Sequence, residues 1–164
     1  METQKANLFL VDDDHLMVSS LKKFLEVRFG DSFNISTFYD GDSCIKNIDS
    51  KTKIVILDYF MEGKNGLETL KLIKAANPKT EVIMLSSNED LAVALETFRV
   101  GAKDYVVKGT GSWQKIKIAV EYIITEPIRI LVREFGISKY MAIFLLTFTS
   151  VGIVVLIALF ALTK

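Results

Sequence analysis

The sequence predicts an α/β fold, in which a doubly wound parallel sheet of five strands is covered by helices on both faces and followed by a single transmembrane helix. Two observations predict this fold. Residues 1–126 alternate short apolar runs with amphipathic stretches, which is the pattern of parallel strands joined by helical crossovers. Residues 140–162 are 23 consecutive uncharged residues, and a helix of that length spans roughly 34 Å, enough to cross a bilayer.

The strands are indicated by short, mostly apolar runs bounded by polar or turn-forming residues. The run at residues 54–57 is the clearest, because four large aliphatic residues follow one another and then meet Asp58. The predicted strands are Leu8–Val11, Phe33–Phe38, Ile54–Leu57, Glu81–Leu85 and Asp104–Val107.

Between the strands, apolar residues recur at helical intervals, and these patterns stop at glycine or before proline. The first of them ends at Gly30. The last is expected to end before Pro127, because the residue that precedes a proline is biased away from helical geometry. The predicted helical stretches are residues 15–30, 66–77, 91–102 and 113–125.

The formal net charge of zero conceals two parts of opposite sign. Residues 1–126 carry 19 acidic and 16 basic residues, a balance of −3, whereas residues 127–164 carry 1 acidic and 4 basic residues, a balance of +3. An isoelectric point near 6.6, without a basic cluster in the first part, argues against nucleic acid as a partner. Cys44 is the only cysteine, which excludes an intrachain disulfide and a cysteine-based metal site.

These features predict three segments: a globular domain over residues 1–126, an amphipathic juxtamembrane linker over residues 127–139, and the transmembrane helix over residues 140–162. The N-terminus shows no signal-peptide pattern. Cations of the linker precede the span, so the positive-inside rule predicts a tail-anchored protein of the cytoplasmic membrane, with its globular domain facing the cytoplasm. Two positions of the linker, along the lipid headgroups or as a continuing stalk, are equally compatible with its sequence.

Four of the five predicted strands end directly before a charged or hydroxyl side chain. Asp12 and Asp13 follow the first strand, Asp58 the third, Ser86 the fourth and Lys108 the fifth. In a doubly wound parallel sheet these strand ends share one edge, where ligands of such folds bind. The sequence therefore predicts one polar site built from four separate parts of the chain.

The residue types at this site indicate phosphoryl transfer. Clustered carboxylates repel one another unless a cation joins them, and a small set of hard oxygen ligands suits Mg²⁺. A magnesium ion and the ammonium of Lys108 would neutralise charge on a transferred phosphoryl group, to which Ser86 could donate a hydrogen bond. Asp58 is then the nucleophile that becomes an aspartyl phosphate.

The motifs LFLVDDD, IVILDYFMEGKNG, VIMLSS and GAKDYVVKG stand in this order within residues 5–125. Through them the chain resembles a response-regulator receiver domain of two-component signalling. The resemblance implies a flavodoxin-like sheet with the strand order 2-1-3-4-5. It also implies that a sensor histidine kinase, or a phosphotransfer protein, donates a phosphoryl group to Asp58 from a phosphohistidine, which makes the chain a phosphoprotein of a phosphorelay.

The resemblance assigns roles to the residues of the acidic cluster. Asp12 and Asp13 match the family's acidic pair, which binds magnesium together with the phosphoacceptor Asp58. The main-chain carbonyl of Phe60 falls where the family completes the magnesium coordination. Lys108 matches the family's lysine at the same site.

Ser86 matches the switch hydroxyl of the family and Tyr105 its switch aromatic, although an ordinary half-buried strand residue explains Tyr105 equally well. The chain departs from the family pattern at three positions. Glu62 and Gly109 each stand where the family usually has proline, and Ser87 replaces a smaller residue. Without a proline at position 109 a cis peptide bond would cost ~2.5–4 kcal/mol, which disfavours the cis form typical of that position.

The leading functional prediction is a membrane-tethered response regulator that signals by conformational switching to an output protein, without an attached output domain. Its chemistry is expected to be limited to its own phosphorylation and dephosphorylation, so it is not predicted to be an enzyme. One alternative is a receiver-fold interaction module that works without phosphate. The other is a phosphatase of the haloacid dehalogenase type, in which Asp12 and Asp14 would form the nucleophile pair, but Leu16 departs from that motif.

Overall fold

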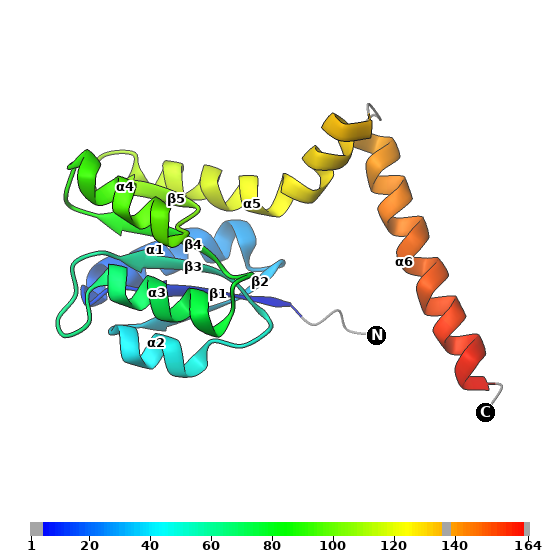
Figure 1. Cartoon of the computed structure of the whole chain (residues 1–164), viewed down its shortest axis with the longest axis horizontal. Coiled ribbons are helices and arrows are strands. Elements are labelled where there is room, and N and C mark those ends of the chain that lie inside the picture. The colour runs from blue at the N-terminus through cyan, green and yellow to red at the C-terminus, as the bar shows by residue number, and fades with distance from the viewer. Residues whose placement is uncertain (1–4, 136–138, 163–164) are drawn as a thin grey trace. The chain divides into compact units, whose positions relative to one another are not determined.

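The computed structural model describes residues 5–135 and 139–162 of the chain. Within them the strands and helices alternate along the chain until the fifth strand, after which two helices follow one another (Figure 1). The strands are β1 (Ala6–Val11), β2 (Phe33–Phe38), β3 (Thr52–Asp58), β4 (Glu81–Ser86) and β5 (Asp104–Val107). The helices are α1 (His15–Phe29), α2 (Gly41–Asn47), α3 (Gly66–Ala76), α4 (Leu91–Val100), α5 (Ser112–Phe135) and α6 (Lys139–Leu162).

The strands form one parallel sheet in the order β2-β1-β3-β4-β5. This order and the five predicted strands are confirmed. The centre of the sheet is β3, which pairs with β1 on one side and with β4 on the other. Its residues from Ile54 to Asp58 are all buried, which explains the unbroken apolar run in the sequence.

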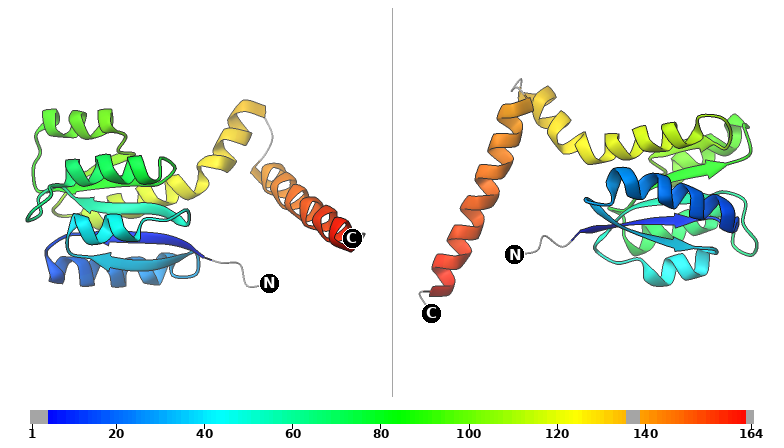
Figure 2. Two further views of the ribbon diagram at one scale, coloured as in Figure 1. Left: turned by 60° about the horizontal axis from the view of Figure 1, so that its bottom comes forward. Right: turned by 180° about the vertical axis from the view of Figure 1, so that it is seen from behind.

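Helices cover both faces of the sheet. In Figures 1 and 2, α1 and the beginning of α5 lie over one face, while α2, α3 and α4 lie over the other. On the first face, the ring of Phe24 in α1 lies 5.4 Å from that of Trp113 in α5. The second face buries a cluster drawn from the strands and from α2 and α3, including Phe9, Val55, Leu57, Leu70, Ile73 and Cys44. The two-sided burial is what makes the sheet a rigid support for the loops at its ends.

Polar residues fix where the helices begin. Asp14 accepts hydrogen bonds from two main-chain N–H groups of the first turn of α1, Asp40 caps α2 and Asp90 caps α4. Asn65 and Glu68 form a reciprocal capping box at the start of α3. Three of these four helices therefore begin at an aspartate in the loop that follows a strand.

Two helices differ from the sequence-based prediction. Helix α2 was not predicted, because its seven residues are too few to display a helical repeat of apolar residues. Helix α5 was expected to end near Thr125, but it continues to Phe135 through Pro127. A proline inside a helix removes one main-chain hydrogen bond and is costly, yet it biases rather than forbids the helical geometry of the residue before it.

The chain divides into two compact units, the first ending at Val120 and the second comprising Glu121–Lys164. The second unit contains α6, which covers the stretch expected to span a membrane. Among the residues that the structure describes, no helix has the combination of length and apolarity needed to cross a membrane. The transmembrane helix predicted at residues 140–162 is therefore not supported by the structure. Of the predicted linker over residues 127–139, residues 136–138 lie outside the described residues.

Candidate functional site

The predicted polar residues lie together at the carboxyl edge of the sheet, which we define as the edge where β1, β3, β4 and β5 end. Asp58 and Ser86 are the last residues of β3 and β4, while Asp12 and Lys108 directly follow β1 and β5. Asp13 lies beside Asp12, and carboxylate oxygens of Asp12, Asp13 and Asp58 lie within 4.8 Å of one another. The prediction that these parts of the chain meet in one place is confirmed.

Lys108 joins two of the three carboxylates. Its Nζ lies 2.8 Å from Oδ2 of Asp12 and 3.0 Å from Oδ1 of Asp58. Burial lowers the pKa of Lys108, but the hydrogen bonds to Asp12 and Asp58 outweigh it and leave the pKa above its ordinary value. The main chain holds the residue in place, because the N–H of Lys108 donates to the carbonyl of Ser86 at 2.7 Å. The ammonium is thus a fixed positive charge between two buried carboxylates.

Asp58 is 2% exposed, and its surroundings disfavour its charged form. Burial raises the pKa of Asp58 to about 6, because the carboxylate loses its hydration. The hydrogen bond from Lys108 opposes that effect, and the charge of Asp12 adds to it. Oδ1 also accepts a hydrogen bond from the N–H of Tyr59 at 2.9 Å. Asp58 is therefore mostly ionised at neutral pH. Because its buried negative charge is poorly hydrated, a cation beside it would be bound strongly.

The three consecutive aspartates, residues 12–14, have different roles: Asp12 belongs to the site, whereas Asp14 caps α1. Asp12 is buried, and its Oδ1 accepts a hydrogen bond from the N–H of Asp14 at 2.9 Å. The side chain of Asp14 instead caps α1 by accepting from the N–H groups of Leu16 and Met17. Two hydrogen bonds to main-chain N–H groups hold the pKa of Asp14 below its usual value. Asp14 is thus a helix cap, as its position before the helix suggests.

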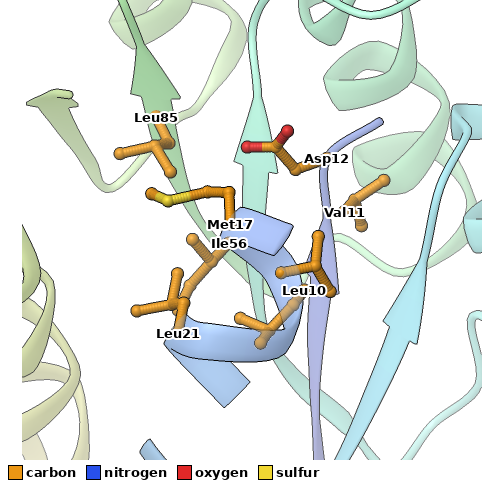
Figure 3. Close-up of a pocket in the computed structure, with 8 residues that line it drawn as sticks. Leu10, Val11, Asp12, Met17, Leu21, Ile56 and Leu85 are labelled. Carbon is orange, nitrogen blue, oxygen red and sulfur yellow. The ribbon is translucent and has the colours of Figure 1, made fainter. Parts of the chain in front are cut away.

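Apolar side chains line a small pocket on one side of Asp12 (Figure 3). Figure 3 shows Met17 and Leu21 of α1 facing side chains of the sheet, with the carboxylate of Asp12 at the upper rim of the same pocket. The strands contribute Leu10, Val11, Ile56 and Leu85. Water is displaced from this side of the carboxylate, which accounts for the low exposure of Asp12 and strengthens its attraction to Lys108.

The donor set fits a magnesium ion. Three carboxylates are hard oxygen ligands, their mutual repulsion calls for a cation, and Asp13 is exposed and so leaves room for water ligands. Oδ2 of Asp13 accepts a hydrogen bond from the N–H of Glu62 at 3.2 Å, which ties the loop after β1 to the loop after β3. Asp12, Asp13 and Asp58 are the residues that would hold the ion. The part expected of the Phe60 carbonyl stays a prediction.

The loop after β3 is held close to the site by a tight approach of Gly66. A Cβ at this position would fall against the carbonyl oxygen of Asp58 and 2.6 Å from Cα of Tyr59. The N–H of Gly66 donates to the carbonyl of Tyr59 at 2.9 Å. Next to it, the side chain of Phe60 is 49% exposed and packs edge-on against Tyr59. Only glycine allows α3 to begin this close to the end of β3.

Asn88 connects the two residues predicted to act as the switch. Ser86 is fully buried, and its Oγ accepts a hydrogen bond from the N–H of Asn88 at 3.0 Å. The hydroxyl of Tyr105 donates to the carbonyl of the same residue at 2.8 Å. Both bonds use main-chain atoms of Asn88, so its residue type could not have revealed them in the sequence. The same holds for the N–H of Glu62.

The loop after Lys108 has its own backbone geometry. Within the described residues no peptide bond is cis, so the Lys108–Gly109 bond is trans, as the absence of proline leads one to expect. Gly109 has φ of 150° and Gly111 has φ of 82°, conformations that favour glycine. Residues 109–111 thus form the turn that leads from the site into α5.

Comparisons with known proteins find the same family that the sequence motifs resemble. The family model of the response regulator receiver domain matches residues 8–121. The transcriptional regulatory protein CpxR of Escherichia coli K12 is 36% identical over 104 residues, which are 62% of this chain and 42% of CpxR. The DNA-binding transcriptional regulator NtrC of Salmonella typhimurium is 36% identical over 107 residues, 64% of this chain and 22% of NtrC. The chain thus spans less than half the length of these curated relatives.

Solved structures show the same architecture. The signal receiver domain of a LuxO repressor homologue from Vibrio parahaemolyticus superposes with a TM-score of 0.67 at 21% identity, covering 75% of this chain and 92% of that one. The response regulator domain of Thermotoga maritima CheB gives a TM-score of 0.61 at 29% identity, covering 73% and 94%. A chain of the CheX-CheY-BeF3-Mg complex of Borrelia burgdorferi gives a TM-score of 0.61 at 27% identity, covering 73% of this chain and 89% of that one.

Proposed function

Because the chain belongs to the response regulator receiver domain family, we propose that Asp58 is its phosphoacceptor and that a sensor histidine kinase or phosphotransfer protein is its phosphoryl donor. One observation carries the proposal. The ammonium of Lys108 lies within 3.0 Å of both Asp12 and Asp58 at the carboxyl edge of the sheet, so a phosphoryl group on Asp58 meets a fixed positive charge.

In the proposed reaction, one carboxylate oxygen of Asp58 forms a bond to phosphorus while the bond from phosphorus to the donor's imidazole nitrogen breaks. The other ring nitrogen of the donor's phosphorylated imidazole carries a proton, so the electron pair of the broken bond leaves the imidazole as a neutral base. With a pKa of about 6, Asp58 is ionised at neutral pH and available as the nucleophile. No other proton needs to move for the transfer.

The neighbours of Asp58 have separate tasks in this proposal. A magnesium ion held by Asp12, Asp13 and Asp58 would neutralise charge on the phosphoryl oxygens. The similar CheX-CheY-BeF3-Mg complex of Borrelia burgdorferi includes magnesium. Lys108 supplies a second positive charge that does not depend on the ion. Ser86 can donate its hydroxyl proton to a phosphoryl oxygen, because the hydrogen bond from Asn88 uses only an acceptor position of Oγ.

The test is labelling of the full chain with acetyl phosphate, followed by measurement of the intact mass. We expect the mass of one phosphoryl group to appear only with magnesium present, and to be absent from Asp58→Asn. The exposed Asp31 provides a matched control, since Asp31→Asn should label like the wild type. A magnesium-dependent gain that persists in Asp58→Asn would contradict the proposal.

The same assay addresses the alternatives. An interaction module that works without phosphate would gain no mass. A phosphatase of the haloacid dehalogenase type would turn over a chromogenic phosphate ester, whereas we propose that this chain is not an enzyme and labels only itself. Against the phosphatase, Asp14 is engaged as the cap of α1 and does not pair with Asp12 as a second acid.

We also propose that the chain is held at the cytoplasmic face of the membrane through α6 and passes its signal to an output protein. The support is the uncharged stretch at residues 140–162 and the exposure of its large apolar side chains, among them Phe148, Val151 and Ile157 at more than 60% each. Cell fractionation tests it. We expect the chain in the membrane fraction, and a version ending at residue 138 in the supernatant; equal distribution of the two would contradict the attachment.

A further inference from the structure

One hydrogen bond at the acidic cluster comes from a main-chain donor 49 residues away along the chain. The N–H of Glu62, in the loop after β3, donates to Oδ2 of Asp13, in the loop after β1, at 3.2 Å. It is the contact through which the β3–α3 loop reaches the exposed member of the cluster.

Asp13 needs such a contact more than its two neighbours do. Asp12 and Asp58 are buried and share the ammonium of Lys108, which fixes their carboxylates. Asp13 is exposed, so its side chain would otherwise exchange between rotamers in water. A ligand that must be ordered when the ion arrives weakens the binding by the entropy of ordering it.

We propose that the Glu62 N–H is a positioning group that holds Asp13 ready for a magnesium ion. A carboxylate has two oxygens with about four lone pairs, so Oδ2 can accept the N–H while the group still coordinates a metal. Hydrogen bonds from outer residues that orient metal ligands commonly strengthen the site. The inference rests on the proposed function only in taking magnesium as the ion of this cluster.

The role belongs to the main chain of residue 62 and not to its side chain, which makes it separable by substitution. Glu62→Pro removes the N–H. Glu62→Gln keeps the N–H and removes only the charge, and Glu62→Ala keeps the N–H and removes the side chain beyond Cβ. All three variants of the full chain are titrated with magnesium chloride in a calorimeter, without any phosphoryl donor.

We expect Glu62→Pro to bind magnesium about 3- to 10-fold more weakly than the wild type, and Glu62→Ala and Glu62→Gln to stay within about 2-fold of the wild type. Equal affinity in Glu62→Pro and the wild type would overturn the inference. A loss in Glu62→Ala and Glu62→Gln as large as in Glu62→Pro would also overturn it, since the side-chain charge would then be responsible.

A second measurement decides the matter if Glu62→Pro fails to fold. In the metal-free wild type, the amide proton resonance of Glu62 should move upfield on Asp13→Ala, because its charged acceptor is lost, and should stay in place on Asp14→Asn. An unmoved resonance in Asp13→Ala would overturn the inference. Because neither measurement involves a phosphoryl group, failure of Asp58 to accept phosphate would contradict the proposed function and leave this result standing.

Discussion

Asp58 is a buried carboxylate whose surroundings oppose its ionisation, and this sets how the stability of the metal-free protein depends on pH. The pKa of Asp58 is about 6 in the folded chain, because of burial, against an ordinary value of 3.8. Between those two values the folded state binds more protons than the unfolded state, so this group makes the free energy of unfolding fall as the pH rises. The penalty is complete above pH 7.

Replacing Asp58 with asparagine should therefore stabilise the protein when no metal is present. We expect the free energy of unfolding of Asp58→Asn to exceed that of the wild type by about 3 kcal/mol at pH 7.5 and by about 1 kcal/mol at pH 4.5. Urea unfolding in EDTA at both values of pH measures the difference. A gain that grows as the pH falls would contradict the assigned direction of the pKa shift; the exposed Asp31→Asn should show no gain at either pH.

The single thiol offers a second test at the scale of one residue. Cys44 is fully buried in the core between the sheet and α2 and α3, and burial raises its pKa to about 12. We expect the native thiol to react with a disulfide reagent at least about 100-fold more slowly than in urea. A thiol introduced at the exposed Ser87 serves as the control, because it should react at once in the native protein. Rapid labelling of Cys44 in the native wild type would show that the core opens readily.

At the scale of the elements, the start of α3 is set by the close approach of Gly66 to β3. Gly66→Ala should cost about 3 kcal/mol of stability, because the new methyl group meets main-chain atoms of Asp58 and Tyr59 that cannot move without shifting the end of β3. Gly63→Ala is the matched control in the same loop. It should cost only about 1 kcal/mol, since Gly63 has φ of 79° but open space around it. Thermal unfolding compares the two, and equal losses would contradict the steric explanation.

The sequence predicts those strands and helices best that bury many apolar side chains. The strands were predictable, because a strand covered on both faces is apolar throughout, as in residues 54–57. Helix α2 was not, since it buries little more than Gly41 and Cys44 and starts at a cap, Asp40, that resembles any loop aspartate. For α5 the sequence predicts too early an end, because Pro127 disfavours helical geometry in the residue before it, whereas the helix continues past the proline.

The same limit applies to the site. The charged and hydroxyl side chains of the site were predictable, because the residue types at the strand ends are visible in the sequence. They are Asp12, Asp13, Asp58, Ser86 and Lys108. The hydrogen bonds made by the main chain of Glu62 and Asn88 were not, since every residue other than proline offers the same N–H and every residue the same carbonyl.

At the scale of the whole molecule, magnesium should stabilise the unit that ends at Val120. Trp113 is the only tryptophan and lies in that unit, against Phe24 of α1, so its fluorescence follows the unfolding of this part of the chain. Magnesium at a hundred times its dissociation constant should raise the free energy of unfolding by about 2.7 kcal/mol. Chelation should reverse the change, and Asp13→Ala should show a much smaller one. An unchanged unfolding transition in the wild type would contradict binding to the folded state.

The arrangement of the strands also has a consequence for how the chain matures. The site gathers residues from β1, β3, β4 and β5, and Lys108 arrives only with β5, the last strand to be synthesised. Parallel pairing across such sequence distances is a slow step of folding. A newly made chain therefore lacks the lysine of the site until its sheet is complete. The proposed phosphoacceptor site is therefore completed only together with the native fold, and an incomplete chain lacks one of its charged groups.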